Sequence, residues 1–180
     1  LVLCLFALYL ACLTADLLPS TAMAQAARPR TPPACTHWSA PNGSGSVCSE
    51  GQPCKIGTWL GSLAQPGTVL CLKDGTYRGE GSMIAIPEFF EGTAERPIVI
   101  RALNPGKVTI DGEDARRPIN TQGSYGILSG VNATRGDNQN VMVRGHHCLI
   151  RDLMTWDVGT GGDTNIHMSG TDNTVEDCGA

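Results

Sequence analysis

Clusters of Lys and Arg are missing from this sequence, and their absence limits the partners that it can have. The 180 residues include 13 Lys and Arg against 17 Asp and Glu, which gives a formal net charge of −4. A nucleic-acid-binding domain would show a basic patch or stripe, so we expect no nucleic-acid partner. A mildly acidic chain is compatible with a polysaccharide, a protein or no ligand at all.

Several signatures of chemistry are missing as well. The cysteines do not form close CxxC pairs and the four histidines are not at ligand spacing, which argues against a zinc site. The glycine-rich stretch 159–163 is followed by neither Lys-Ser nor Lys-Thr, so it is not a phosphate-binding loop. No Ser-His-Asp or Cys-His arrangement stands out. The sequence therefore indicates its scaffold more clearly than its chemistry.

After the first residues, no segment is apolar over the roughly 20 residues that span a bilayer. Residues 1–13 are almost entirely apolar, and Ala22-Met23-Ala24 fits a small-x-small cleavage pattern. Asp16 and Pro19 interrupt the run too early for a membrane anchor. We therefore expect residues 1–24 to be a signal peptide whose start is missing, and the mature protein to be secreted or periplasmic, without a membrane span.

Six cysteines would remain after cleavage, and export permits disulfides: Cys35, Cys48, Cys54, Cys71, Cys148 and Cys178. Cys48 and Cys54 flank the short loop Ser-Glu-Gly-Gln-Pro, so we predict a disulfide between them. The pairing of the other four stays open at this point.

One amphipathic helix is expected near the start of the mature chain. Residues 25–34 (QAARPRTPPA) are rich in Pro and Ala and are typical of a linker. Ile56, Trp59, Leu60 and Leu63 then follow at i, i+3, i+4 and i+7, which places them on one face of a helix over 54–64. We assign residues 35–67 to an N-terminal strand and a capping helix.

From Thr68 onward the pattern changes to short strands that Gly, Asn and Asp separate. The predicted strands are Thr68–Lys73, Pro97–Leu103, Lys107–Ile110, Tyr125–Val131, Val141–Arg144, Cys148–Leu153, Ile166–Ser169 and Thr174–Cys178, after an earlier one at Thr36–Ala40. No helix-length apolar periodicity lies between them. That excludes a βαβ sheet and leaves a sandwich, a barrel or a β-solenoid.

A repeat decides among these three architectures. The segment 140–145 (NVMVRG) matches 165–170 (NIHMSG) at an offset of 25 residues, and the same offset aligns Ile150 with Val175 and Asp152 with Asp177. An earlier copy aligns Ile127 with Leu149 at an offset of 22. These offsets predict one solenoid coil per unit, with Leu128, Ile150 and Val175 stacked inside. The fold class is therefore an all-β, right-handed parallel β-helix with residues 68–180 as its first coils, in a fragment of a longer protein.

The residues that open this solenoid resemble a known group. The segment 39–46 (SAPNGSGS), the helix, and 65–78 (QPGTVLCLKDGTYR) are similar to the N-terminal start of bacterial pectate-lyase-like right-handed β-helix proteins, and 92–102 (GTAERPIVIRA) and 108–112 (VTIDG) continue the likeness. It covers roughly residues 36–180. The group includes polysaccharide lyases, hydrolases, epimerases and proteins without known activity, so one fold serves many functions.

The resemblance implies a secreted, monomeric polysaccharide lyase that cleaves uronate-containing, acidic polymers by β-elimination. Lyases of this group need a base, often Arg or Lys, and a positive partner for the uronate carboxylate, often Ca²⁺ held by Asp and Glu. Their site lies across several middle coils, so the catalytic residues are expected largely beyond residue 180. The alternative is a non-catalytic, adhesive β-helix at the cell surface that binds glycan or protein.

Few residues within this chain are candidates for chemistry. Arg144 and His167 lie on outward registers and are the candidate bases or carboxylate ligands. Trp156 and Asp157 lead into the glycine-rich loop and are candidates for sugar binding. Asp152 and Asp177 should stack one coil apart, either as a Ca²⁺ ligand pair or as a polar ladder of ordinary turn residues.

Overall fold

The computed structural model describes residues 31–159, 161 and 164–180, and its folded unit comprises Pro33–Ala180. The predicted signal peptide, residues 1–24, and most of the predicted linker lie outside the described residues. No helix of the described part is long and apolar enough to cross a membrane.

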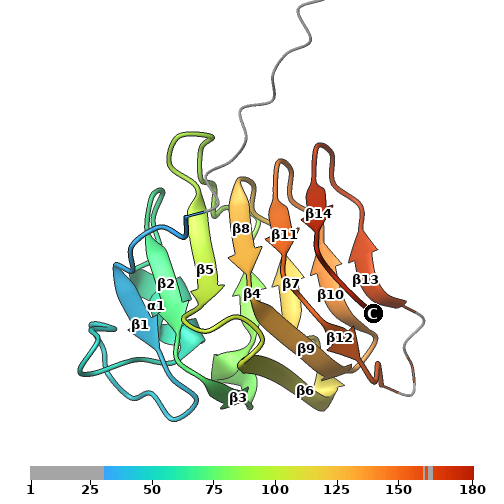
Figure 1. The fold of residues 1–180 in the computed structure, drawn as a ribbon, viewed down its shortest axis with the longest axis horizontal. Coiled ribbons are helices and arrows are strands. Elements are labelled where there is room, and N and C mark those ends of the chain that lie inside the picture. The colour runs from blue at the N-terminus through green and yellow to red at the C-terminus, as the bar shows by residue number, and fades with distance from the viewer. Residues whose placement is uncertain (1–30, 160, 162–163) are drawn as a thin grey trace, which may run out of the picture. The chain divides into compact units, whose positions relative to one another are not determined.

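Three parallel sheets form this unit, and from β2 onward consecutive strands along the chain belong to different sheets. We call the sheet β1-β2-β5-β8-β11-β14 sheet A, β3-β6-β9-β12 sheet B, and β4-β7-β10-β13 sheet C. Each coil takes one strand from A, B and C in that order, and successive coils add along one direction (Figure 1). Parallel strands that are linked through crossovers in this way form a right-handed parallel β-helix, as the sequence predicted.

The strands are short because turn residues, mostly Gly, Asp or Asn, follow most of them. Sheet A contains β1 (His37–Ser39), β2 (Val69–Leu72), β5 (Ile98–Ala102), β8 (Gly126–Ser129), β11 (Leu149–Arg151) and β14 (Thr174–Glu176). Sheet B contains β3 (Gly75–Tyr77), β6 (Val108–Arg116), β9 (Val131–Gly136) and β12 (Thr155–Trp156). Sheet C contains β4 (Ile84–Ile86), β7 (Ile119–Thr121), β10 (Gln139–Val143) and β13 (Thr164–Met168).

The coil register confirms the predicted repeat. Ile150 pairs with Val175 and Leu149 with Ile127, at the offsets read from the sequence. Leu70, Ile100, Leu128 and Ile150 follow one another in register from coil to coil, and each is at most 3% exposed. Val175 continues this column but is 42% exposed, because no described strand pairs with the far side of β14.

Three predicted strands extended across a turn: Tyr125–Val131, Cys148–Leu153 and Thr174–Cys178. The sequence analysis placed a single strand over Tyr125–Val131, but Gly130 adopts a φ of 73° and divides it into β8 and β9. In that left-handed conformation the chain turns from sheet A into sheet B, and glycine adopts it without steric cost. The corresponding turn residues of the next two coils are Asp152 and Asp177, with φ of 52° and 50°.

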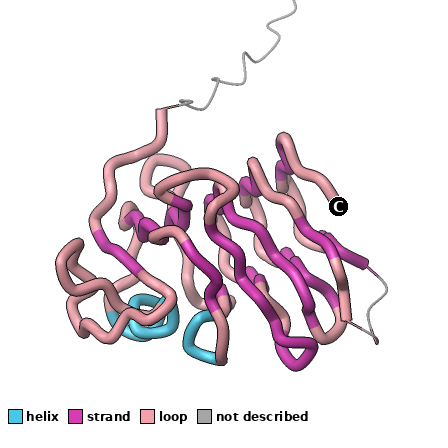
Figure 2. Tube along the Cα trace, turned by 60° about the horizontal axis from the view of Figure 1, so that its bottom comes forward, coloured by secondary structure: helices cyan, strands magenta, loops and turns pink. Residues whose placement is uncertain are grey.

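A helix and two disulfides close the N-terminal end of the stack. The helix α1 (Ile56–Ser62) is shorter than predicted, but it buries Ile56, Trp59 and Leu60 in the core cluster as expected, beside β4 and the 3₁₀ turn η1 (Glu80–Ser82). Figure 2 shows both helices at this end. The predicted disulfide Cys48–Cys54 is present, together with Cys35–Cys71, which the sequence had left open.

The stacked column generates a stability prediction. We expect Ile150→Ala to lower the free energy of unfolding by about 2–5 kcal/mol, because the shorter side chain leaves a cavity that the neighbouring coils cannot fill. The matched variant Val175→Ala removes side-chain volume at the same register from an exposed site and should cost about 1 kcal/mol or less. Urea unfolding measures both values; equal losses would contradict the coil arrangement.

Candidate functional site

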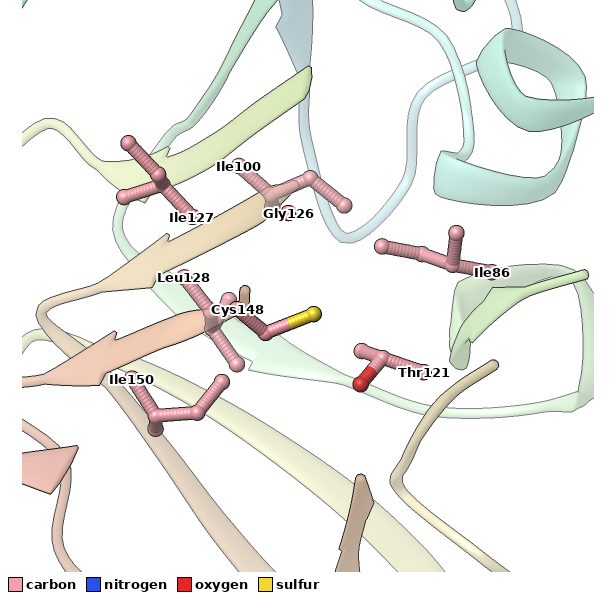
Figure 3. Close-up of a pocket in the computed structure, with 8 residues that line it drawn as sticks. All are labelled: Ile86, Ile100, Thr121, Gly126, Ile127, Leu128, Cys148 and Ile150. Atoms are coloured by element: carbon pink, nitrogen blue, oxygen red, sulfur yellow. The ribbon is translucent and has the colours of Figure 1, made fainter. Parts of the chain in front are cut away.

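One internal cavity of the described part of the solenoid is too small to hold a ligand. The cavity between sheets A and C has a volume of about 10 Å³, and it is lined by Ile86, Ile100, Thr121, Gly126, Ile127, Leu128, Cys148 and Ile150. Figure 3 shows the Cys148 sulfur directed into this space, toward Thr121 and Ile86. A single water molecule needs roughly 10–15 Å³, so no sugar ring fits inside. A sugar-binding site is therefore expected on an outer face and not in this cavity.

The outer face of sheet C carries the two predicted catalytic candidates. Met142 pairs with Asn120 and with His167, so these three residues form an outward column over three coils. Arg144 lies two residues beyond Met142 and donates its backbone N–H to the carbonyl of Thr121 (2.8 Å). Arg144 and His167 are both exposed. The structure thus brings them to diagonal positions on adjacent coils of one face.

Unsatisfied polar atoms also gather around sheet C. Four buried side-chain atoms on its strands or on the turn that leads into it form no hydrogen bond with any described residue: Arg117 Nε, Asn120 Oδ1, Thr121 Oγ1 and Thr164 Oγ1. Arg117 uses its Nη2 instead, which donates to Gln139 Oε1 (2.8 Å). Buried polar groups are nearly always paired, by protein atoms or by ordered water, so these are positions where a water molecule or a ligand would complete the pairing. Sheet C also carries both predicted catalytic candidates, Arg144 and His167.

Trp156 and Asp157, the predicted sugar-binding pair, lie where sheet B turns toward sheet C. Trp156 is the last residue of β12, pairs with Thr134 on the outer face of sheet B and is 41% exposed. Asp157 has a φ of 50°, and its carbonyl accepts the backbone N–H of Arg135 (2.8 Å). Of the glycine-rich loop that follows, residues 160, 162 and 163 lie outside the described residues.

Asp152 and Asp177 stack at the turn between sheets A and B, one coil apart. Asp152 Oδ2 accepts a hydrogen bond from Ser129 Oγ (3.4 Å) and lies 3.9 Å from Arg151 Nε. In a three-sided coil this turn is the corner opposite sheet C, so the structure does not bring the acid pair to Arg144 and His167. Within the described ranges, no three His, Cys, Asp or Glu side chains come close enough together to hold a metal ion.

The sequence analysis missed an ion-pair network on the outer face of sheet B. The Asp111 side chain is only 4% exposed and lies 2.9 Å from Arg78 Nε and 3.0 Å from Arg135 Nε. Asp111 pairs with Thr134, while Arg78 comes directly after β3. The sequence could have indicated this network only through the alignment of Arg78, Asp111 and Thr134, the neighbour of Arg135, on successive coils. That alignment can be made only when the length of each coil is known.

Two of the altered pKa values within the described residues mark packing at the capped end. Burial raises the pKa of the Tyr77 hydroxyl, which lies 2.9 Å from the carbonyl oxygens of Ser39 and Lys73. Burial lowers the pKa of Arg101, whose Nε donates to the carbonyl of Pro33 (3.1 Å). Both groups tie the N-terminal segment to the first coils, and neither belongs to the outer face of sheet C.

Comparisons with known proteins agree with this architecture. The family model described as chondroitinase B matches residues 62–156. The crystal structure of pectate lyase Pel9A is similar over 66% of this chain and 32% of that chain, with 26% identity and a TM-score of 0.54. An alginate lyase from Paenibacillus sp. str. FPU-7 covers 68% of this chain and 40% of its own, with 19% identity and a TM-score of 0.48.

No curated protein matches the sequence. The chain spans less than half the length of either solved structure. The matched residues begin in α1 and run to the end of β12, so the family resemblance resides in the stacked coils described above.

Asp152 is either a turn residue or a calcium ligand, and a substitution at this position distinguishes the two roles. We expect Asp152→Asn to be tolerated, because Asn adopts the left-handed conformation readily, whereas Asp152→Val should cost about 1–3 kcal/mol of unfolding free energy. We also expect added calcium to leave the melting temperature of the wild-type protein unchanged. A calcium-dependent rise that Asp152→Asn or Asp177→Asn abolishes would instead identify the pair as metal ligands.

Proposed function

Because this chain belongs to the chondroitinase B family, we propose that it contributes the first coils of a secreted polysaccharide lyase that cleaves uronate-containing polymers by β-elimination. The observation that carries the proposal is the family match over residues 62–156. The family and the solved pectate lyase are named for acidic polysaccharides, which supports a uronate polymer as the substrate. The two disulfides support export, because disulfides persist in oxidising compartments.

The reaction that we propose needs few groups. A base removes the proton at C5, next to the uronate carboxylate, and the electron pair of that C–H bond forms the C4–C5 double bond. The bond between C4 and the glycosidic oxygen breaks, and the oxygen leaves as a hydroxyl after it gains a proton. A positive group beside the carboxylate lowers the barrier, because negative charge builds up there in the transition state.

Arg144 and His167 suit two of these roles. The guanidinium of Arg stays charged at every working pH and matches a carboxylate with two parallel donors, so Arg144 is the proposed carboxylate ligand. The imidazole ring of His167 offers a nitrogen that can accept a proton, so His167 is the proposed base. The match covers only 32% of the pectate lyase chain, so we propose that further catalytic groups lie in coils beyond residue 180.

Calcium does not fit the described part of this face. Ca²⁺ takes six to eight oxygen ligands, largely from carboxylates and carbonyls. Asp152 and Asp177 lie at the opposite corner of the coil, and no acidic cluster accompanies Arg144 and His167 in the described ranges. We therefore assign no step of the reaction to calcium. The second candidate function is that of an adhesive β-helix, which would bind glycan without cleaving it.

An activity assay tests the proposal. We would incubate the full-length protein with pectate, alginate and chondroitin, with and without Ca²⁺, and follow the ultraviolet absorbance of the unsaturated uronate. Arg144→Ala and His167→Ala should each lower kcat/KM by about 10²–10⁴-fold, as expected for groups that bind or deprotonate the reacting sugar. Arg96→Ala, an exposed position between β4 and β5, is the matched control and should leave the rate unchanged.

Two results would count against this proposal. If no uronate polymer gives an absorbance change, the protein is not a lyase of this kind, and binding without cleavage would favour the adhesive alternative. If cleavage occurs but neither Arg144→Ala nor His167→Ala slows it, the catalytic face lies elsewhere on the solenoid.

A further inference from the structure

The outer face of sheet B carries a row of side chains that the proposed reaction does not use. It presents one outward residue from each of four consecutive coils: Arg78, Asp111, Thr134 and Trp156. Coils in a parallel solenoid follow one another at about 4.8 Å. The row therefore runs along the solenoid axis, as an extended polymer would.

Asp111 holds two guanidinium groups in place at this face. Its Oδ2 accepts a hydrogen bond from Arg78 Nε (2.9 Å), and its Oδ1 accepts the backbone N–H of Glu113 (2.9 Å) and forms the ion pair with Arg135 Nε. The carboxylate is buried, whereas the side chains of Arg78 and Arg135 remain 58% and 42% exposed. Both contacts are made through Nε, so the terminal nitrogens of the two guanidinium groups are left for an outside partner.

The charges in this cluster balance, because Arg78, Arg116 and Arg135 face Asp111, Glu113 and Asp114, but they are not shared equally. Two guanidinium groups surround one buried carboxylate, and Glu113 is engaged separately by Arg116 Nη1 at 2.6 Å. Asp114 Oδ2 lies 3.4 Å from Arg135 Nε and is the one further acid that competes for it. Arg78 has no second acidic partner among the described residues, so it is the more available of the two cations.

Trp156 supplies an aromatic surface at the other end of the row. Its backbone carbonyl accepts hydrogen bonds from Thr134 Oγ1 (3.0 Å) and Asn140 Nδ2 (2.8 Å), which hold the strand in place. Its ring is nonetheless 41% exposed, although burying an aromatic ring is normally favourable. A fixed, exposed Trp in the same row as anchored Arg side chains combines apolar contact with anion recognition.

We propose that the outer face of sheet B is a second, non-catalytic binding surface for an acidic polysaccharide, on which Arg78 and Arg135 bind carboxylate or sulfate groups and Trp156 stacks on a sugar ring. The planar fork of Arg suits both anions. The ligand class rests on the proposed function, whereas the surface itself lies on a different sheet from Arg144 and His167. A polymer bound here would be retained near the catalytic face between cleavage events.

Equilibrium binding tests this surface independently of cleavage. Affinity electrophoresis of the full-length protein would use gels that contain chondroitin sulfate, hyaluronan, polygalacturonate or neutral dextran. Trp156→Ala and Arg78→Gln should each weaken binding to an acidic polymer by about tenfold, as expected for residues that dominate an interface. Phe89→Ala, which removes an 81% exposed aromatic ring from the segment between β4 and β5, and Arg96→Gln are the matched controls and should bind normally.

Recognition of sulfate and recognition of carboxylate predict binding to different sets of polymers. Binding to chondroitin sulfate alone would identify sulfate as the recognised group, whereas binding to hyaluronan and polygalacturonate as well would identify the carboxylate. Arg78→Lys keeps the positive charge but loses the planar, two-donor guanidinium group. It should therefore retain only part of the affinity that Arg78→Gln loses. Cleavage of long polymers by Trp156→Ala should show a raised KM with an unchanged kcat.

The proposal fails if Trp156→Ala and Arg78→Gln melt at the wild-type temperature and bind every acidic polymer with wild-type affinity, or if the wild-type protein binds none of these polymers. Failure of the lyase proposal is distinguishable from both results. A protein that binds acidic polymers through this surface but releases no unsaturated product would retain the second surface and lose the activity.

Discussion

Stacking of each coil on the next is the constraint on which the rest of this structure depends. Leu70, Ile100, Leu128 and Ile150 are buried only because the equivalent strands of adjacent coils lie directly above and below them. Full burial of such a side chain contributes about 1.5–3 kcal/mol, and a single coil could not supply it alone. The first coil is exposed on one side, which explains why α1 and the Cys48–Cys54 loop cover it.

Because the cavity between sheets A and C is too small for a sugar, ligands are expected to bind on the outer faces of the sheets, and these three faces differ. At its N-terminal end, sheet A is covered on the outside by a small apolar cluster in which Trp38 and the Cys35–Cys71 disulfide pack on Val69 and Val99. Sheet C presents Arg144 and His167, together with unsatisfied polar atoms. Sheet B presents the anchored Arg side chains and Trp156. Substrate chemistry and substrate retention can therefore be assigned to separate faces of the same coils.

Much of the fold followed from local patterns. The strands of sheet A lie within the runs that the sequence analysis recognised, although three of them have only three residues, and the helix was visible from its i, i+3, i+4 spacing. The strands β3, β4, β7 and β12 have two or three residues and were missed, and so was most of β9, whose residues after Val131 are largely polar or small. Gly130 was placed inside a strand because its left-handed φ depends on the tertiary turn and not on its neighbours in sequence.

The sequence by itself determined the coil period, the register of Ile150 on Val175 and the Cys48–Cys54 disulfide, because each of these depends on residues that are close in the chain or that repeat at a constant offset. Only the tertiary structure decided which outward residues share a face. Arg78, Asp111 and Arg135 meet because loops of unequal length return the chain to the same register in each coil. Cys35 and Cys71 meet for the same reason, across a separation of 36 residues.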